Sequence, residues 1–107
     1  METKEILKRI LPDAEPYERT LYLLYNYKDL KNGKRINEEG REIAKMIEKA
    51  IEMLGDDKYI DIIKMTIQGE KPDEIADKIP LERNSVYKQR RRLIKRLSII
   101  IFGDKAL

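Results

Sequence analysis

The stretch "PDEIADKIPLERNSVYKQRRRLIKRL", residues 72–97, determines how the rest of the chain is interpreted. Its first eight residues predict a helix of two turns, because Pro72 favours a first helical turn and two acids follow it. The inner face of this helix is expected to carry Ile75, Ala76 and Ile79. The residues "PLERN" then break the helix, and a longer one follows.

The longer helix is predicted from residue 83 or 84 to residue 102, and Gly103 ends it. Val86, Leu93 and Leu97 recur at helical spacing on its inner face. Residues 83–96 carry seven positive charges and no negative one. A helix that only solubilises a surface usually mixes both signs, which allows pairs at i,i+4. The one-sided charge therefore predicts a polyanionic partner, and nucleic acid is the first candidate.

Four more helical segments are predicted upstream. They cover residues 2–11, 16–31, 38–54 and 57–68. The second is expected to start at Pro16 or Tyr17. The third is expected to be capped by Asn37 and to end at Gly55. The inward residues are expected to be Ile43, Ile47, Ala50, Ile51 and Leu54 in the third segment, and Tyr59, Ile62, Ile63 and Ile67 in the fourth.

The composition supports a helical fold. Leu, Ile, Glu, Lys and Arg are abundant, whereas the chain has 5 Gly and 4 Pro in 107 residues. Such usage favours helices over strands, and the length is that of one domain. The predicted fold class is all-α, a small helical domain with a C-terminal helix-turn-helix. Residues 1–56 would form a helical support or dimerisation region, and residues 57–107 the helix-turn-helix region.

Several function classes are disfavoured by what the sequence lacks. Without Cys there are no disulfides or thiolate sites, and without His the commonest metal ligand and general base are missing. No segment approaches the ~18 apolar residues of a membrane span, and no secretory pattern opens the chain, so a cytoplasmic protein is expected. The acid pairs Glu38-Glu39, Asp56-Asp57 and Asp73-Glu74 lie at helix starts, where carboxylates favour the helix dipole. We therefore expect no enzyme, no metal site and no cofactor.

A short helix, a tight turn and a longer basic helix are typical of a helix-turn-helix unit that binds double-stranded DNA. Leu81 in the turn is expected to fill the gap between the two helices. The outward side chains of the longer helix are expected to be Asn84, Ser85, Tyr87, Lys88, Arg91, Arg92 and Lys95. Base contacts are expected at its N-terminal end, from Arg83, Asn84, Ser85, Tyr87 and Lys88. Phosphate contacts are expected from Arg91, Arg92 and Lys95.

The segment "GEKPDEIADKIPLERNSVYKQRRRLIKRLSIIIFG", residues 69–103, resembles the C-terminal unit of phage late-gene regulators of the ArpU and RinA type. The DNA-binding part of that family is similar to region 4 of bacterial sigma factors. The matching features are "EIA" at residues 74–76, Leu81, Ser85 before "VY", "LIKRL" and the closing "IFG". "YLLYNYKDLK", residues 22–31, resembles the tyrosine-containing helix upstream in that family. The resemblance covers roughly residues 17–103.

Two residues depart from the family pattern. Pro80 stands where a glycine or small polar residue is usual, and Glu82 stands where Ser or Thr is common. A carboxylate still caps a helix, so the departure at Glu82 leaves the fold intact and alters phosphate contacts there. The resemblance implies a transcriptional activator that binds a late promoter and engages bacterial RNA polymerase.

Two alternatives to activation stay open. The first is an accessory factor for recombination or excision of a mobile element, which would use the same helix on DNA. The second is an interaction module that docks on polymerase or a phage protein without touching DNA, so that its basic face meets an acidic protein surface. Co-purification with a recombinase would favour the first, and the lack of any DNA shift at low salt would favour the second.

The tyrosines of the N-terminal half and the apolar C-terminal segment each allow two interpretations. Tyr17, Tyr22, Tyr25 and Tyr27 could stack on bases, but they fall on different sides of one helix, so packing with the hydroxyls at the rim is favoured. The segment "LSIIIFG", residues 97–103, has apolar groups on nearly all sides. It either folds back on the N-terminal helices or forms a homodimer or polymerase interface.

Overall fold

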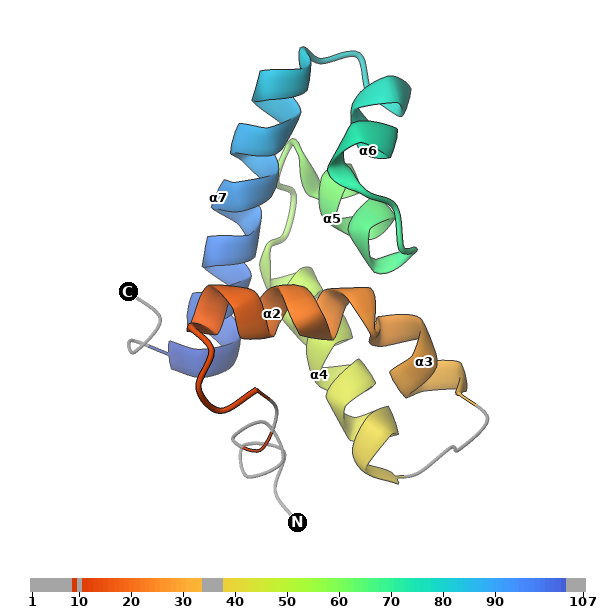
Figure 1. Cartoon of the computed structure of the whole chain (residues 1–107), viewed down its shortest axis with the longest axis vertical. Coiled ribbons are helices and arrows are strands. Elements are labelled where there is room, and N and C mark those ends of the chain that lie inside the picture. The colour runs from red at the N-terminus through yellow and green to blue at the C-terminus, as the bar shows by residue number, and fades with distance from the viewer. Residues whose placement is uncertain (1–8, 10, 34–37, 104–107) are drawn as a thin grey trace.

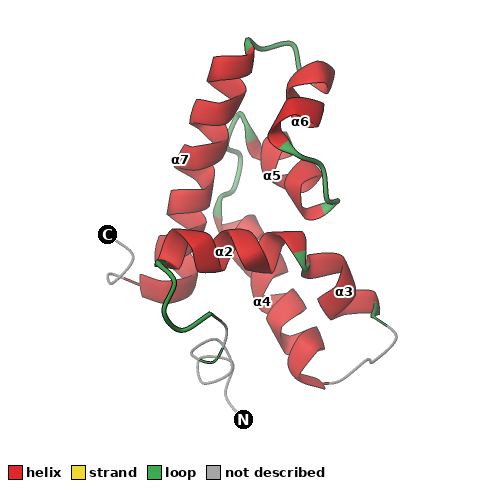
Figure 2. Cartoon of the chain, viewed as in Figure 1, coloured by secondary structure: helices red, strands yellow, loops and turns green. Residues whose placement is uncertain are grey.

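The computed structural model describes residue 9, residues 11–33 and residues 38–103. Six helices lie in these ranges, and no strand does (Figures 1 and 2). They are α2 (Pro16–Tyr25), α3 (Tyr27–Asn32), α4 (Glu38–Met53), α5 (Ile60–Ile67), α6 (Pro72–Lys78) and α7 (Arg83–Phe102). The all-α prediction is confirmed.

The first predicted helix, residues 2–11, and the N-cap at Asn37 fall mostly or wholly outside the described residues. Arg9 and Leu11 are described, and neither is helical. Leu11 has a positive φ of 44°. A helix ending at Leu11 is therefore wrong, because Pro12 disfavours helical geometry at the residue before it.

Helix α7 organises the described part of the chain. Helix α6 packs against its N-terminal half, α2 and α4 pack against its C-terminal half, and α5 contacts α2, α6 and α7 (Figure 1). This arrangement leaves one long side of α7 uncovered. Its bounds, Arg83–Phe102, agree with the predicted ones, and Gly103 follows with a φ of 78°.

A small core joins α5, α6 and α7. Ile62, Ile75 and Val86 each come from one of these helices and are fully buried. Partly buried side chains that pack around them include Ala76, Ile79 and Leu81. The predicted inward faces of α6 and of the N-terminal half of α7 are confirmed, as is the role of Leu81 in the turn.

The main core lies where α2, α4 and α5 meet the C-terminal half of α7. Its buried members include the predicted stripe of α4, with Ile43, Ile47, Ala50 and Leu54, and the predicted Leu93 and Leu97 of α7. Ile51 is only partly buried at its edge. Ile100, Ile101 and Phe102 pack against this core, so much of the apolar C-terminal segment covers the N-terminal helices.

A buried polar contact also joins α2 to α7. Ser98 Oγ lies 2.9 Å from Thr20 Oγ1 and 2.9 Å from the Ile94 carbonyl oxygen. Thr20 Oγ1 donates to the Pro16 carbonyl oxygen at 2.8 Å. Both hydroxyls are therefore satisfied in the interior, which buried polar groups require. Residues from 1–56 and from 57–107 share this interior, and the functional division between these two regions stays a prediction.

The predicted helix over residues 16–31 is interrupted at Asn26. Asn26 has φ −99° and ψ 4°, which ends α2, and α3 begins at the next residue. Its side-chain Nδ2 donates to the Tyr22 carbonyl oxygen at 2.8 Å. Side-chain amides of this kind compete with the helical backbone for hydrogen bonds, which is why the single long helix was wrong.

Helix α5 begins later than predicted. The prediction placed its start at Asp57, whereas the helix starts at Ile60. The Asp57 carboxylate accepts a hydrogen bond from the Tyr59 backbone N–H at 3.0 Å, a local turn that competes with the helix. Asp57 is thereby placed to face α7.

Candidate nucleic-acid interface

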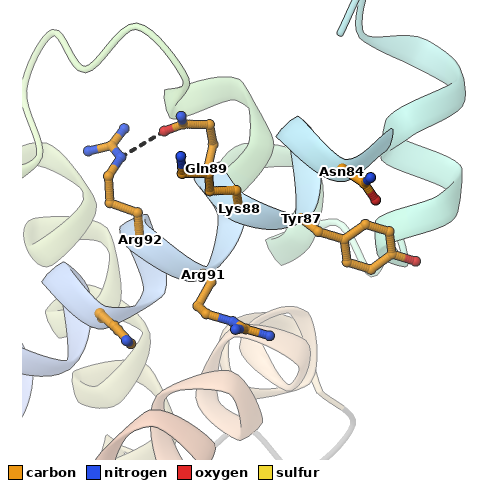
Figure 3. A pocket seen from close by; sticks show the side chains of 7 residues that line it. Asn84, Tyr87, Lys88, Gln89, Arg91 and Arg92 are labelled. Atoms are coloured by element: carbon orange, nitrogen blue, oxygen red, sulfur yellow. Dashed lines mark hydrogen bonds between the residues drawn. The ribbon is translucent and has the colours of Figure 1, made fainter. Parts of the chain in front are cut away.

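The uncovered side of α7 carries a stripe of polar side chains. Asn84, Lys88, Arg91 and Lys95 are exposed and follow one another at spacings of four, three and four residues, which places them on one face of the helix. We call these four residues the outer stripe. An open hollow runs along this face, lined by the outer stripe together with Tyr87, Gln89 and Arg92 (Figure 3). Every lining residue belongs to α7, so the hollow is accessible from solvent along the helix.

Three cations of the outer stripe have no acidic partner among the residues that the structure describes. Lys88, Arg91 and Lys95 form no ion pair within the described part of the chain, and Asn84 forms no hydrogen bond there through its side chain. Their charge is therefore available to an anion from outside. In Figure 3, the side chain of Arg91 leaves the helix in a different direction from that of Arg92.

Arg92 and Arg96 are held by Asp57. Arg92 Nη1 and Nη2 donate to the two carboxylate oxygens at 3.0 and 2.9 Å, and Arg96 Nη1 donates at 3.0 Å. The Asp57 side chain is only 9% exposed. These donors, first that of Arg92 and then the Tyr59 N–H, lower the pKa of Asp57 from 3.8 to about 2. Arg92 also donates through Nε to Gln89 Oε1 at 2.7 Å (Figure 3).

This pairing changes the expectation for Arg92. Its side chain is exposed on the hollow, but three of its five guanidinium N–H donors are already used by protein acceptors. A phosphate contact by Arg92 stays a prediction, and it would have to compete with Asp57. The phosphate contacts expected from Arg91 and Lys95 face no such competition in the described structure.

Arg83 and Tyr87 face α6. Arg83 Nη1 donates to Asp73 Oδ1 at 3.3 Å, and its Nη2 lies 3.8 Å from Asp77 Oδ1. The Tyr87 hydroxyl donates to the same Asp73 oxygen, and this hydrogen bond raises the pKa of Tyr87. Both side chains are exposed, as expected for Tyr87. Ser85 is half-buried, so it is less exposed than its predicted outward position implies.

Arg90 differs from its basic neighbours, because its side chain is buried. It is 8% exposed, its Nη2 donates to the Tyr25 hydroxyl at 2.6 Å, and its Nε has no hydrogen-bond partner among the described residues. The guanidinium carbon lies 5.8 Å from the centre of the Tyr25 ring. The sequence did contain the signal: Arg90 follows Val86 by four residues and precedes Leu93 by three, which is the spacing of the inner face.

The four tyrosines of α2 and α3 do not form one surface. Tyr27 is buried and its hydroxyl donates to Glu48 Oε1 at 2.7 Å, while Tyr17 packs against the main core. Tyr22 and Tyr25 are exposed. The preference for packing with a polar rim is confirmed for Tyr27.

Other kinds of site find no counterpart in the described residues. No group of three or more acidic side chains there is arranged to hold a metal ion. None of the described helices is long and apolar enough to cross a membrane. Comparisons with protein-family models, with curated proteins and with solved structures found no match.

Proposed function

We propose that this protein is a sequence-specific regulator of transcription that places the N-terminal half of α7 in the major groove of double-stranded DNA. The observation that carries the proposal is the outer stripe, with three cations that no carboxylate of the described chain neutralises. A major groove about 12 Å wide admits one α-helix. Helix α7 offers a full uncovered side for this, backed by α5 and α6.

The outer stripe gives each residue a role by its position. Asn84 and Lys88 lie in the first turns of α7, where helix-turn-helix proteins contact base edges. An Asn side chain suits adenine and a Lys suits guanine. Arg91 and Lys95 lie further along and would contact phosphates, which position the protein without choosing a sequence. Arg83, Ser85, Tyr87 and Arg92 are secondary candidates, since each is half-buried or already engaged by a protein group.

The biological setting follows from the resemblance to phage late-gene regulators. We extend the proposal to an activator of phage or mobile-element late genes that acts with bacterial RNA polymerase in the cytoplasm. Dimerisation through residues 1–56 is part of this proposal. The accessory factor for recombination remains the main alternative, because it would use α7 on DNA in the same way.

The test is selection of bound duplexes from a random-sequence pool at about 50 and about 200 mM salt. The proposal predicts an enriched motif that persists at the higher salt, and a symmetric motif would support a dimer. Binding without enrichment that is lost as salt rises would contradict sequence-specific regulation. Absence of binding at the lower salt would favour the interaction module that does not touch DNA.

A further inference from the structure

One carboxylate at the N-terminal end of α7 holds two of the side chains expected to contact DNA. Asp73 Oδ1 accepts hydrogen bonds from Arg83 Nη1, at 3.3 Å, and from the Tyr87 hydroxyl. Asp77, one turn further along α6, lies 3.8 Å from Arg83 Nη2. Arg83 and Tyr87 are thus directed toward α6 in the unbound protein.

These contacts do little to hold the two helices together. The side chains of Asp73 and Arg83 are 60% and 58% exposed, and solvent-exposed ion pairs of this kind contribute little to stability. The attachment of α6 to α7 rests instead on the buried contact between Ile75 and Val86. The main effects of Asp73 are therefore on the direction of two side chains and on the local charge.

Both effects bear on DNA that approaches α7. A carboxylate beside the N-terminal end of α7 would lie near the phosphate backbone and repel it. Arg83 and Tyr87 must also exchange Asp73 for DNA before they can contact it. Binding to DNA of any sequence relies on phosphate charge, so this opposition weakens it everywhere. A cognate site offsets this loss of affinity, because its bases form contacts with Arg83 and Tyr87 that replace those with Asp73. A repulsive carboxylate of this kind therefore raises the preference for cognate over non-cognate DNA.

We propose that Asp73 is a specificity-determining residue, which holds Arg83 and Tyr87 toward α6 and lowers binding to non-cognate DNA. This inference rests on the proposed function of α7. The inference adds a residue outside α7 to those that determine DNA specificity. It gives Asp73 a role beyond the favourable interaction of a carboxylate with the start of α6.

The experiment compares Asp73→Asn with Glu74→Gln. Glu74 is exposed on the same helix, and its side chain forms no hydrogen bond or ion pair among the described residues. The control Glu74→Gln therefore removes one negative charge without affecting a contact of Arg83 or Tyr87. Each variant is titrated with a random-sequence duplex and with the duplex selected by the wild type. Thermal unfolding of both variants checks that they fold.

We expect Asp73→Asn to bind the random duplex about fivefold more tightly than wild type, the effect of one unit charge near a phosphate in water. Its affinity for the selected duplex should change less, so the ratio between the two falls, while Glu74→Gln keeps the wild-type ratio. Equal effects in both variants, or an unchanged ratio in Asp73→Asn, would overturn the inference and leave the proposed function standing. A wild type that binds neither duplex at low salt would overturn both.

A second readout needs no DNA. The hydrogen bond to Asp73 raises the pKa of Tyr87, and NMR of isotopically labelled tyrosine rings follows that ionisation directly. Asp73→Asn should lower the pKa of Tyr87 toward its ordinary value, whereas Glu74→Gln should leave it in place. A Tyr87 titration that is the same in wild type and in Asp73→Asn would show that Asp73 does not hold this side chain.

Discussion

The Lys and Arg side chains of α7 are chemically similar, but they differ in whether another side chain of the protein contacts them. Lys88, Arg91 and Lys95 point to solvent without an acidic partner in the described structure. Arg83, Arg92 and Arg96 each pair with a carboxylate. Arg90 is buried beside Tyr25. The charge that we propose to face DNA is accordingly that of the outer stripe, and each of the other cations has a structural contact that a substitution would disturb.

Asp57 is the residue whose loss should most affect stability. Asp57→Asn leaves Arg92 and Arg96 with a weaker acceptor, so we expect the free energy of unfolding to fall by about 1.5–3 kcal/mol, a typical value for hydrogen bonds to a charged group. The two released arginines should also strengthen binding to DNA of any sequence. Denaturant unfolding and a DNA titration measure these effects. Unchanged stability would contradict the ion-pair assignment.

The pH dependence of this effect follows from the pKa of Asp57, which the fold lowers from 3.8 to about 2. A lowered pKa stabilises the folded state while the carboxylate is ionised. The contribution is complete above the unfolded value of 3.8 and is lost as pH falls toward about 2. The difference in stability between wild type and Asp57→Asn should therefore shrink between pH 5 and pH 2, which urea titrations at each pH would show.

Arg90 gives a prediction of the opposite kind. Its guanidinium is buried with one hydroxyl acceptor and no carboxylate among the described residues, which costs solvation energy. Arg90→Met keeps most of the side-chain volume and removes the charge, so the free energy of unfolding should stay within about 1 kcal/mol of wild type or rise. A loss of about 3 kcal/mol or more would mean that the charge has a buried partner.

At the scale of the elements, α7 combines two opposite sides. Its inner side joins both cores through Val86, Leu93 and Leu97, and its outer side carries the outer stripe. A rotation of α7 by one residue about its axis would turn a cation of the outer stripe toward the cores and expose an apolar side chain. Packing of the two cores therefore determines which side of α7 faces outward. The geometry of the outer stripe is therefore a consequence of packing.

Arg91 and Arg92 are adjacent and chemically identical, which makes them a matched pair. Arg91→Ala should weaken binding to all duplexes and reduce the salt slope by about 1, the value for one lost phosphate contact. Arg92→Ala should affect DNA binding less and stability more, because Arg92 is engaged by Asp57. Fluorescence anisotropy at several salt concentrations, with thermal unfolding, separates the two. Equal DNA effects would contradict this distinction.

Asn84 should act on sequence choice. Asn84→Ala removes a side chain at the first turn of α7 that could donate to and accept from a base edge. We expect the selected motif to change at one position, while affinity for a random duplex stays near the wild-type value. Repeating the selection with the variant tests this. An identical motif would exclude Asn84 from base contacts.

At the scale of the whole molecule, the sequence predicted the all-α fold class, the bounds of α7 and most of the core. These features follow from short-range spacing and from strong breaks such as Pro72 and Gly103. It did not predict the break at Asn26, the late start of α5 or the burial of Arg90. Each of these depends on a side-chain contact: Asn26 with Tyr22, Asp57 with the Tyr59 backbone, and Arg90 with Tyr25. Only the last joins residues far apart in the chain, at a separation of 65 positions.

The sequence predicted most of the exposed residues of the candidate site, but it did not predict which of its cations are paired with carboxylates. Spacing alone placed Asn84, Tyr87, Lys88, Arg91 and Lys95 on the outside, as observed. Spacing carries no information on which cations meet carboxylates of other elements, such as Asp57 and Asp73. That distribution requires the tertiary arrangement of α5 and α6 around α7.

The most direct test of the account is the salt dependence of DNA binding in two triple variants. One carries Lys88→Ala, Arg91→Ala and Lys95→Ala. The other carries Lys28→Ala, Lys45→Ala and Lys49→Ala, which removes equal charge from exposed positions on α3 and α4, away from the N-terminal half of α7 (Figure 1). We expect a slope of roughly −1.8 for wild type and the control, the value for phosphate contacts by Arg91 and Lys95, and a slope near zero for the first variant. Equal slopes in the two triple variants would contradict the claim that the outer stripe of α7 binds DNA.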